Sequence, residues 1–399
     1  WLWPITVFDG INDPDNEEIN YYYPTSDLVT APEIIFFWVA RMIVAGYEYR
    51  DEMPFKNVYF TGIVRDKQRR KMSKSLGNSP DPIELMKKYG ADGVRAGMLF
   101  SAPAGNDLLF DEKLCEQGRN FSNKLWNAFR LIQTLEVSDK GKDQSLAIDW
   151  INSRFNEVLK EVDDHFSKYR ITDALLSLYT FIWDDFCSWY LEIIKDNSIS
   201  DKTHKGTLAV LDKILKTLHP FMPFITEELW NQIDKERDYI MISEYPLPEN
   251  FDEVLNNDFK KVFEMVTGLR KLKSDNKIKQ IDVVEVMINK KSDFDFIKYR
   301  ELIEKLSKTK DLQEVNEIPS NYPTLISGKD TLCLAIEKSE DSKEDTLKQI
   351  EYLEGFLKSV DKKLSNKSFV DNAPESVVEI ERKKRDDAVI KLENLKKSI

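Results

Sequence analysis

The stretch KMSKSLGN, residues 71–78, places two lysines three positions apart, between serines, in a loop that ends in Gly-Asn. Residues 65–74 carry six basic side chains and one acidic, although the whole chain has a formal net charge of −12. A local positive cluster on an acidic chain indicates a specific site for a polyanion. Lysine ammonium groups suit phosphate oxygens whose charge grows during a reaction. The alternative is a solvated basic loop before a helix, because a Lys-x-x-Lys pair alone occurs by chance.

The elements around this loop must place the two lysines. A short β-rich run, NVYFTG at residues 57–62, leads into the basic stretch, and Pro32–Gly46 has the apolar spacing of a helix that ends in glycine. A strand that runs into a cationic loop is typical of a phosphate clamp. The first 110 residues are therefore expected to mix strands and helices around this loop.

The composition excludes several classes of protein. The 399 residues are 41% hydrophobic and 32% charged, which is typical of a globular protein with two or three domains. Cys115, Cys187 and Cys333 lie far apart without metal-ligand spacing, so we expect neither a disulfide framework nor a structural zinc, and a cytoplasmic location. The longest apolar run is too short to cross a membrane, so no membrane partner is expected. The start at Trp1, inside an apolar segment, predicts a fragment of a longer chain.

The pattern along the chain predicts a multidomain, mainly α-helical protein in four parts. Residues 1–111 form a mixed α/β part with the basic loop, and 112–265 are almost wholly helical. Residues 266–340 form a small α/β module with strands near 283–288 and 332–336. Residues 341–399 carry two heptad-spaced apolar stripes joined by a short connector, which predicts an antiparallel coiled-coil hairpin.

The full string KMSKSLGN is similar to the signature loop of class I aminoacyl-tRNA synthetases. Other segments, over nearly the whole chain, resemble the valyl-tRNA synthetases from the end of their editing insertion to their C-terminus. Isoleucyl enzymes often end in a zinc module and leucyl enzymes lack the heptad arm, so the valyl family fits best. The segments are YYYPTSDLVTAPEIIFFWVARMI (21–43), YFTGIVRD (59–66), GADGVRAGML (90–99), GRNFSNKLWNAFR (118–130), LHPFMPFITEELW (218–230) and YLEGFLKSVDKKLSNKSFVDNAPESVVEIERKK (352–384).

The resemblance implies a reaction and a set of residues. The family activates valine with ATP, bound with Mg²⁺, and transfers the valyl group to the 3′ end of valine tRNA. Residues 1–111 would then be the C-terminal half of a Rossmann-like nucleotide-binding domain. Lys71 and Lys74 would be catalytic, holding the β- and γ-phosphates. The implied ATP-binding residues are Gly62, Lys71, Met72, Ser73, Lys74 and Ser75, and the implied valine-binding residues are Trp3, Glu33, Ile34 and Trp38.

Two positions depart from the family pattern. Glu33 stands where many members have aspartate, and Arg69 stands where relatives commonly have glycine in the turn before the loop. Without the family, Ile34 and Trp38, at i and i+4 on one helix face, would more readily be interpreted as core residues. In LHPFMPFITEELW, the aromatic and leucine side chains are expected to be core and His219 a hydrogen-bonded structural histidine.

The resemblance also implies that residues 112–265 bind the anticodon and that the C-terminal hairpin binds tRNA. The basic stretch at 270–279 fits an RNA backbone contact equally as well as a solvated helix end. The alternative is that this segment forms a dimerising coiled coil. We expect instead that the hairpin pairs within one chain and that the protein is monomeric. The candidate tRNA-binding residues are Arg270, Lys271, Lys362, Lys363, Lys383 and Lys384.

The second class I signature, His-x-Gly-His, is not formed by any of the three histidines of this chain. The chain is therefore expected to carry half of an active site and to bind tRNA without catalysing the reaction alone. Two functional hypotheses remain open. The chain is either the C-terminal part of a valine–tRNA ligase or a non-catalytic tRNA-binding module derived from one.

Overall fold

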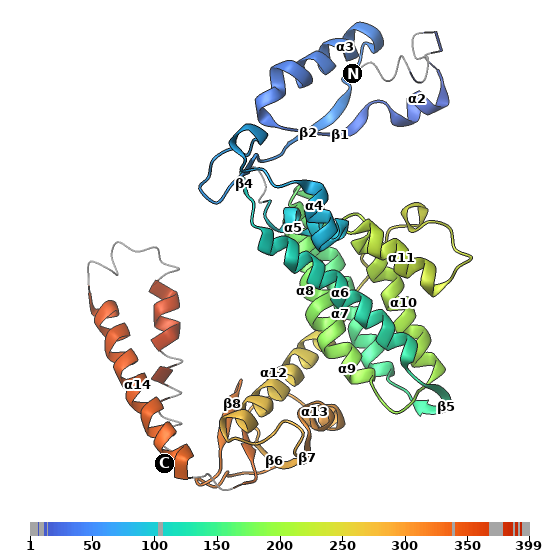
Figure 1. The fold of residues 1–399 in the computed structure, drawn as a ribbon. Helices are drawn as coiled ribbons and strands as arrows, with labels where there is room; N and C mark the ends of the chain where they lie inside the picture. The colour runs from blue at the N-terminus through green and yellow to red at the C-terminus, as the bar shows by residue number, and fades with distance from the viewer. Residues whose placement is uncertain are drawn as a thin grey trace. The chain divides into compact units, whose positions relative to one another are not determined.

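A computed structural model describes residues 7, 12–13, 15–102, 107–336, 340–366, 378–385, 388–389 and 392. Its contacts divide the chain into two compact units, Trp1–Asp252 and Glu253–Ile399. This division is coarser than the four predicted domains, whose boundaries stay predictions. Each unit is described by itself below (Figure 1).

The first unit begins with a β-α-β crossover. Strands β1 and β2 pair in parallel, with Asp27 opposite Asn57, and the connection between them is helical. The cis peptide Tyr23–Pro24 lies just before β1. Two parallel strands joined by a helix are the repeating unit of nucleotide-binding α/β folds. The elements are α2 (Glu17–Tyr22), β1 (Thr25–Thr30), a 3₁₀ turn (Pro32–Ile34), a π-helical turn (Ile35–Val39), α3 (Ala40–Arg50) and β2 (Phe55–Phe60).

A second parallel pair flanks the basic loop. Strand β3 pairs with β4, and the chain between them holds the KMSKSLGN loop and two helices. Gly97 of α5 lets the α6 backbone come close, because a Cβ atom at Gly97 would lie 2.6 Å from the amide nitrogen of Cys115. The elements are β3 (Val64–Arg65), a 3₁₀ turn (Lys74–Leu76), α4 (Pro82–Tyr89), α5 (Ala91–Phe100) and β4 (Leu108–Leu109).

A helical bundle forms the rest of the first unit. Helix α7 packs against α8 and α10 (Figure 1). The buried core includes Phe121 of α6, Trp150 of α7 and Phe186 of the π-helical segment. The predicted helical character of this region is confirmed, although a short strand, β5, interrupts it. The elements are α6 (Glu112–Thr134), β5 (Val137–Lys142), α7 (Ser145–Ser167), α8 (Ile171–Thr180), a π-helical segment (Phe181–Tyr190), α9 (Leu191–Ile194), α10 (Asp201–Leu218), α11 (Pro223–Ile233) and a 3₁₀ turn (Ile240–Ile242).

Helix α5 is fastened to the turn between α10 and α11. The Asp92 carboxylate accepts the backbone N–H groups of Phe224 and Ile225 at 3.3 and 2.6 Å, which caps the start of α11. The Arg95 guanidinium donates to the carbonyl oxygens of Phe221 and Pro220, both at 3.1 Å. Asp92 is 6% exposed, and desolvation raises its pKa above the ordinary value. The Asp-x-x-Arg pair of α5 therefore bonds to residues that lie 125 to 133 positions away in the chain.

The second unit holds a mixed four-stranded sheet in the order β7-β6-β9-β8. Strand β7 is parallel to β6, whereas β9 is antiparallel to both β6 and β8. Helix α12 contacts β8 and β9, and α13 contacts β7, so the sheet has a helical layer (Figure 1). The predicted strands near 283–288 and 332–336 are confirmed as β6 and β9. The elements are α12 (Glu253–Asp275), β6 (Val284–Asn289), a 3₁₀ turn (Phe296–Tyr299), α13 (Arg300–Ser307), β7 (Thr309–Glu314), β8 (Thr324–Ser327) and β9 (Asp330–Leu334).

A buried lysine connects α12 to the end of α13. Lys273 is 0% exposed, and its ammonium donates to four backbone carbonyl oxygens. The acceptors are Gln280 at 3.3 Å, Asp282 at 2.6 Å, Ser307 at 3.0 Å and Lys308 at 2.8 Å. Cations are favourable at a helix C-terminus, where carbonyl groups lack helical partners. Desolvation lowers the pKa of Lys273, but the carbonyl cage is built for the ammonium form.

The C-terminal segment contains a long helix, α14 (Glu340–Ser365), and a second helical stretch at 378–385. Lys363 of α14 forms an ion pair with Glu381 of the second stretch at 3.7 Å, so the two approach each other there. Val360 and Val378 are buried. The predicted connector at Asn372–Pro374 lies outside the described residues.

Two local expectations are wrong. Pro32–Gly46 is not one regular helix, because a 3₁₀ turn and a π-helical turn precede α3. Ile34 and Trp38 therefore do not occupy i and i+4 positions of an α-helix. Phe224 is 64% exposed, although Phe221, Leu229 and Trp230 are buried as expected. Phe224 lies in the first turn of α11, off the face that carries Leu229 and Trp230.

Replacing Lys273 by methionine should lower the free energy of unfolding of the protein by about 2–4 kcal/mol, because four carbonyl oxygens around a buried ammonium group lose their donor. Urea denaturation followed by circular dichroism measures the change. Lys271→Met is the matched control, since Lys271 is an exposed neighbour on the same helix and should change stability by less than about 0.5 kcal/mol. Equal effects of the two substitutions would contradict the structural role of the cage.

Candidate active site around the basic loop

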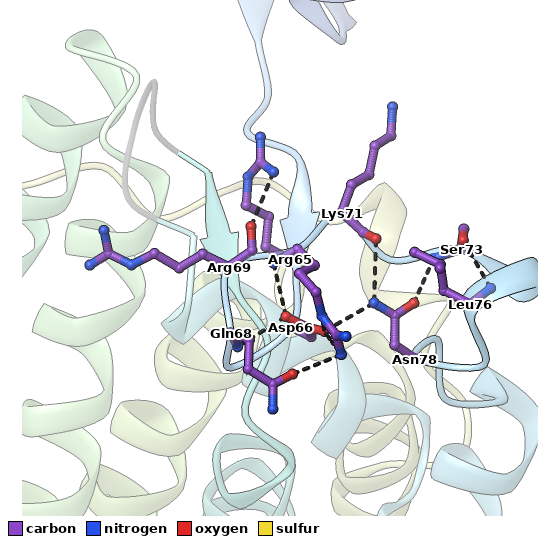
Figure 2. Close-up of polar contacts among 9 residues, drawn as sticks. Arg65, Asp66, Gln68, Arg69, Lys71, Ser73, Leu76 and Asn78 are labelled. Carbon is purple, nitrogen blue, oxygen red and sulfur yellow. Dashed lines mark hydrogen bonds and ion pairs between the residues drawn. The ribbon is translucent and has the colours of Figure 1, made fainter.

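The basic loop begins with a tight turn after β3. Arg65 and Lys71 form an antiparallel bridge, and residues 66–70 close the turn between them. Arg69 adopts φ +63°, the left-handed region that favours glycine. The turn therefore has the conformation that a glycine would permit, and arginine occupies it at some cost in backbone strain. Figure 2 shows this turn and the loop that follows it.

Asp66 holds the turn together. Its Oδ1 accepts the backbone N–H groups of Gln68 at 3.0 Å and Arg70 at 2.9 Å, and its Oδ2 accepts the Arg70 Nε at 2.8 Å (Figure 2). Its Oδ2 also accepts a hydrogen bond from the Asn78 side chain at 3.0 Å. The bonds from Asn78 and then Arg70 lower the pKa of Asp66 from 3.8 to about 2. Asp66 therefore stays charged near neutral pH.

Asn78 closes the loop at its other end. Its Oδ1 accepts the backbone N–H of Ser73 at 2.9 Å, and its Nδ2 donates to the carbonyl oxygen of Lys71 at 3.3 Å (Figure 2). Ser73 in turn caps the 3₁₀ turn, because its Oγ accepts the Leu76 N–H at 3.3 Å. Gly77 ends this turn at φ +64°. Residues 71–78 therefore form a loop whose backbone is held at several points.

The two signature lysines are exposed. The side chain of Lys71 is 61% exposed and lies 3.3 Å from the Glu33 carboxylate, while Lys74 begins the 3₁₀ turn on the solvent side. Ser73 and Ser75 share a hydrogen bond of 3.1 Å between their hydroxyl oxygens. The loop thus presents ammonium and hydroxyl groups that could donate to phosphate oxygens. Met72 is partly buried beside them, and Gly62 lies two residues after the end of β2.

The structure brings only part of the predicted valine-binding set to the loop. Glu33 joins it through the ion pair with Lys71. Ile34 is partly buried and Trp38 is 49% exposed, on the 3₁₀ and π-helical turns before α3. Phe36 and Phe37 of the same turn are 85% and 62% exposed, so these aromatic side chains are not core residues of the described chain. Trp3 lies outside the described residues.

The predicted tRNA-binding residues lie in the second unit. Arg270 donates to the carbonyl oxygen of Leu306 through Nε at 3.1 Å and Nη2 at 2.7 Å, whereas its neighbour Lys271 is exposed. Lys363 and Lys384 both pair with Glu381. Lys362 and Lys383 are exposed on the two helical stretches of the C-terminal segment.

Sequence reasoning missed Asp66 and Asn78. The string KMSKSLGN included Asn78, but its side chain has no obvious chemical role until the loop is folded. Asp66 was counted only as the one acidic residue in a basic stretch. Within the described residues, no group of three or more His, Cys, Asp or Glu could hold a metal ion. No helix in the part of the chain that the structure describes is long and apolar enough to cross a membrane.

Comparisons with known proteins agree along the chain. Residues 2–111 match the family described as tRNA synthetases class I (I, L, M and V), residues 149–288 the anticodon-binding domain of tRNA ligase, and residues 340–399 the valyl tRNA synthetase tRNA binding arm. The valine–tRNA ligase of Christiangramia forsetii is 51% identical over 421 residues, and that of Phocaeicola vulgatus is 50% identical over 412 residues. Each alignment covers 100% of this chain and, respectively, 47% and 46% of the relative. The chain therefore spans about half the length of the curated relatives that it matches.

A solved LeuRS–tRNA–LeuAMS ternary complex from Agrobacterium radiobacter K84 is also similar, with a TM-score of 0.44 at 18% identity. The match covers 58% of this chain and 29% of that chain, and is too low to support a conclusion.

Asp66 should make a stabilising contribution that depends on pH. Its folded pKa of about 2 lies below the ordinary 3.8, so its hydrogen bonds stabilise the folded state above about pH 4 and are lost as the pH falls towards 2. Asp66→Asn should therefore lower the melting temperature at pH 6, and the difference from the unsubstituted protein should shrink between pH 4 and pH 2. Melting curves by circular dichroism measure it. A difference that stays constant over this range would show that the Asp66 charge is not responsible.

Proposed function

We propose that this chain, which belongs to the valine–tRNA ligase family, supplies the C-terminal part of an enzyme that activates valine with ATP and transfers it to valine tRNA. The proposal rests above all on the KMSKSLGN loop, because a pure tRNA-binding module has no use for a pyrophosphate clamp. The non-catalytic tRNA-binding module remains the alternative. Since tRNA is charged where proteins are made, we place the enzyme in the cytoplasm.

In the proposed reaction, a carboxylate oxygen of valine attacks the α-phosphorus of ATP. The bond from this phosphorus to the bridging oxygen of the β-phosphate breaks, and pyrophosphate leaves with the electron pair. The 3′-terminal ribose hydroxyl of the tRNA then attacks the valyl carbonyl, and AMP leaves. Mg²⁺ enters with ATP as part of the substrate. The protein contributes positioning and charge stabilisation, because neither step needs a covalent bond to a side chain.

The loop residues act on the leaving pyrophosphate. Lys71 and Lys74 hold the β- and γ-phosphates as negative charge moves onto them, and the hydroxyl groups of Ser73 and Ser75 donate further hydrogen bonds. Their exposure supports this role, since the ammonium groups can reach a ligand without breaking the fold. Gly62, next to the end of β2, lets adenine approach the backbone, and Met72 lines the same site.

The pocket for valine is proposed at the turns before α3. Glu33 faces the substrate ammonium or the ribose, and Ile34 and Trp38 contact the apolar side chain, together with Trp3. The exposed aromatic surface of these turns supports a contact with a ligand or with a further part of the enzyme. In the described chain Lys71 pairs with Glu33, so ATP and valine would each release one partner of this pair.

The remaining parts are proposed to bind tRNA. The helical bundle binds the anticodon end, and the C-terminal segment, α14 with the stretch at 378–385, forms a coiled-coil arm against the outer corner of the tRNA. Exposed cations on both stretches support contacts with RNA phosphates, because proteins recognise folded RNA largely by its shape and by the charge of its backbone. We expect the enzyme to be monomeric, since the two stretches pair within one chain.

Catalysis tests the role of the loop. In the full-length enzyme, Lys74→Ala should lower the rate of valine-dependent ATP–pyrophosphate exchange by about a hundredfold, with little change in the KM for valine, because the ammonium acts on charge that develops in the transition state. Lys87→Ala, which removes an exposed cation of α4, is the matched control and should leave the rate unchanged. An undiminished rate for Lys74→Ala would remove the loop from the mechanism.

Binding tests the arm. The double substitution Lys362→Ala and Lys383→Ala should weaken the binding of valine tRNA and reduce the slope of log K against log salt by about 2, because two phosphate contacts no longer release counterions. Filter binding at several salt concentrations measures both quantities. Lys310→Ala, on the sheet and paired with Glu285, is the control. An unchanged slope would contradict the assignment of this segment to tRNA.

A further inference from the structure

The amide side chain of Asn78 bonds to three groups, and each bond fits its chemistry. Its Oδ1 faces a donor, the Ser73 N–H, at 2.9 Å. Its Nδ2 faces two acceptors, the Lys71 carbonyl oxygen at 3.3 Å and the Asp66 Oδ2 at 3.0 Å. This network fixes which end of the amide carries the nitrogen. A carboxylate at position 78 would place one of its oxygens against both acceptors. An apolar side chain would leave all three groups without this hydrogen-bond partner.

Asp66 anchors this amide to the turn before the loop. It is 8% exposed and accepts four hydrogen bonds, of which only one comes from Asn78. The other three come from Gln68 and Arg70 and hold the carboxylate in one orientation. Figure 2 shows Asp66 between the turn at 66–70 on one side and Asn78 on the other. The negative charge of Asp66 within the basic stretch also offsets the mutual repulsion of the surrounding cations.

Two of the three groups that Asn78 binds lie on the backbone of the signature loop, beside its lysines. The Lys71 carbonyl and the Ser73 N–H bracket Met72, and Ser73 is the residue directly before Lys74. The Ser73 hydroxyl then caps the turn that Lys74 begins. The ammonium groups themselves are exposed, whereas the backbone that carries them is held by hydrogen bonds. Holding the backbone reduces the conformational entropy that must be lost when the loop closes on a ligand.

From this geometry we propose that Asp66 and Asn78 are positioning residues for the activation step: they form a latch that presents the backbone of Lys71, Ser73 and Lys74 in the conformation that stabilises the leaving pyrophosphate. This role rests on the proposed function of the loop. Neither residue touches a substrate; each acts through the backbone of the loop. The latch serves the step in which pyrophosphate leaves and has no part in the transfer of the valyl group, which takes place after pyrophosphate has gone.

The test uses the full-length enzyme and the variants Asn78→Ala, Asn78→Asp and the exchange of the pair, Asp66→Asn with Asn78→Asp. Asn78→Ala should lower kcat for ATP–pyrophosphate exchange by about 10–50-fold and change the KM for ATP by less than about threefold, because the loss falls on the transition state. Asn78→Asp should be at least as impaired. The exchanged pair restores one amide facing one carboxylate, but it sets an oxygen of residue 78 against the Lys71 carbonyl and an amide nitrogen of residue 66 against the Arg70 guanidinium. It should therefore stay as impaired as Asn78→Asp.

Two reference variants and one further rate separate the possible failures. Asn127→Ala, an exposed asparagine of α6, controls for loss of an amide and should keep full activity. Single-turnover transfer from valyl-adenylate to tRNA should be unchanged in the Asn78 variants, whereas general misfolding would slow both steps. Melting curves identify a variant that does not fold, and Asn78→Ser, which keeps a small polar group, then replaces Asn78→Ala.

The outcomes distinguish the latch from the function on which it rests. If Lys74→Ala is strongly impaired but Asn78→Ala keeps kcat within about twofold, the latch is wrong and the function of the loop stands. A raised KM with an unchanged kcat, equal losses in activation and transfer, or full activity of the exchanged pair would also overturn the latch. If Lys74→Ala itself keeps its activity, the proposed function fails, and the role of the latch fails with it.

Discussion

The grip of α5 on the turn between α10 and α11 is the constraint on which the first unit depends. Asp92 caps the start of α11, and Arg95 holds the two carbonyl groups just before it. A buried carboxylate is unfavourable unless its oxygens are hydrogen-bonded. Here two N–H groups of α11 donate to the Asp92 carboxylate at the positive end of the helix dipole. Because α4 and α5 follow the basic loop directly in the chain, this grip also connects the loop to the helical bundle.

Much of this arrangement could be predicted from residue patterns. Helical spacing in residues 112–265 identified the bundle, since apolar positions repeat over long stretches that bury one face. The basic loop that ends in Gly-Asn pointed to phosphate chemistry, because lysine spacing and local charge can be determined from the sequence alone. His219 was expected to be structural, and its Nδ1 lies 2.7 Å from the hydroxyl oxygen of Thr226.

What could not be predicted depends on contacts between distant residues. The roles of Asp66 and Asn78 appear only when a turn brings positions twelve residues apart within 3.0 Å. The π-helical turn at Ile35–Val39 has no signal in apolar spacing, which made Ile34 and Trp38 look like neighbours on one helical face. Strand β7 is rich in polar residues and β8 has only four residues, so that their pairing with β6 and β9 is set by the sheet and not by their own sequences. At Arg69 the sequence suggested a change that the structure does not show, because arginine adopts the left-handed conformation that glycine would favour there.

The carbonyl cage of Lys273 gives the second unit a chemical reporter of its own opening. Amine-directed reagents modify only lysines that are accessible and can lose a proton, and most lysines whose burial the structure describes meet the first condition. Lys273 is buried, with its ammonium enclosed by backbone oxygens from the loop after α12 and from the end of α13. It can react only when that junction opens, so the rate at which it is labelled measures local unfolding rather than surface exposure. A single native side chain thus records, without any introduced probe, how often α12 and the end of α13 separate.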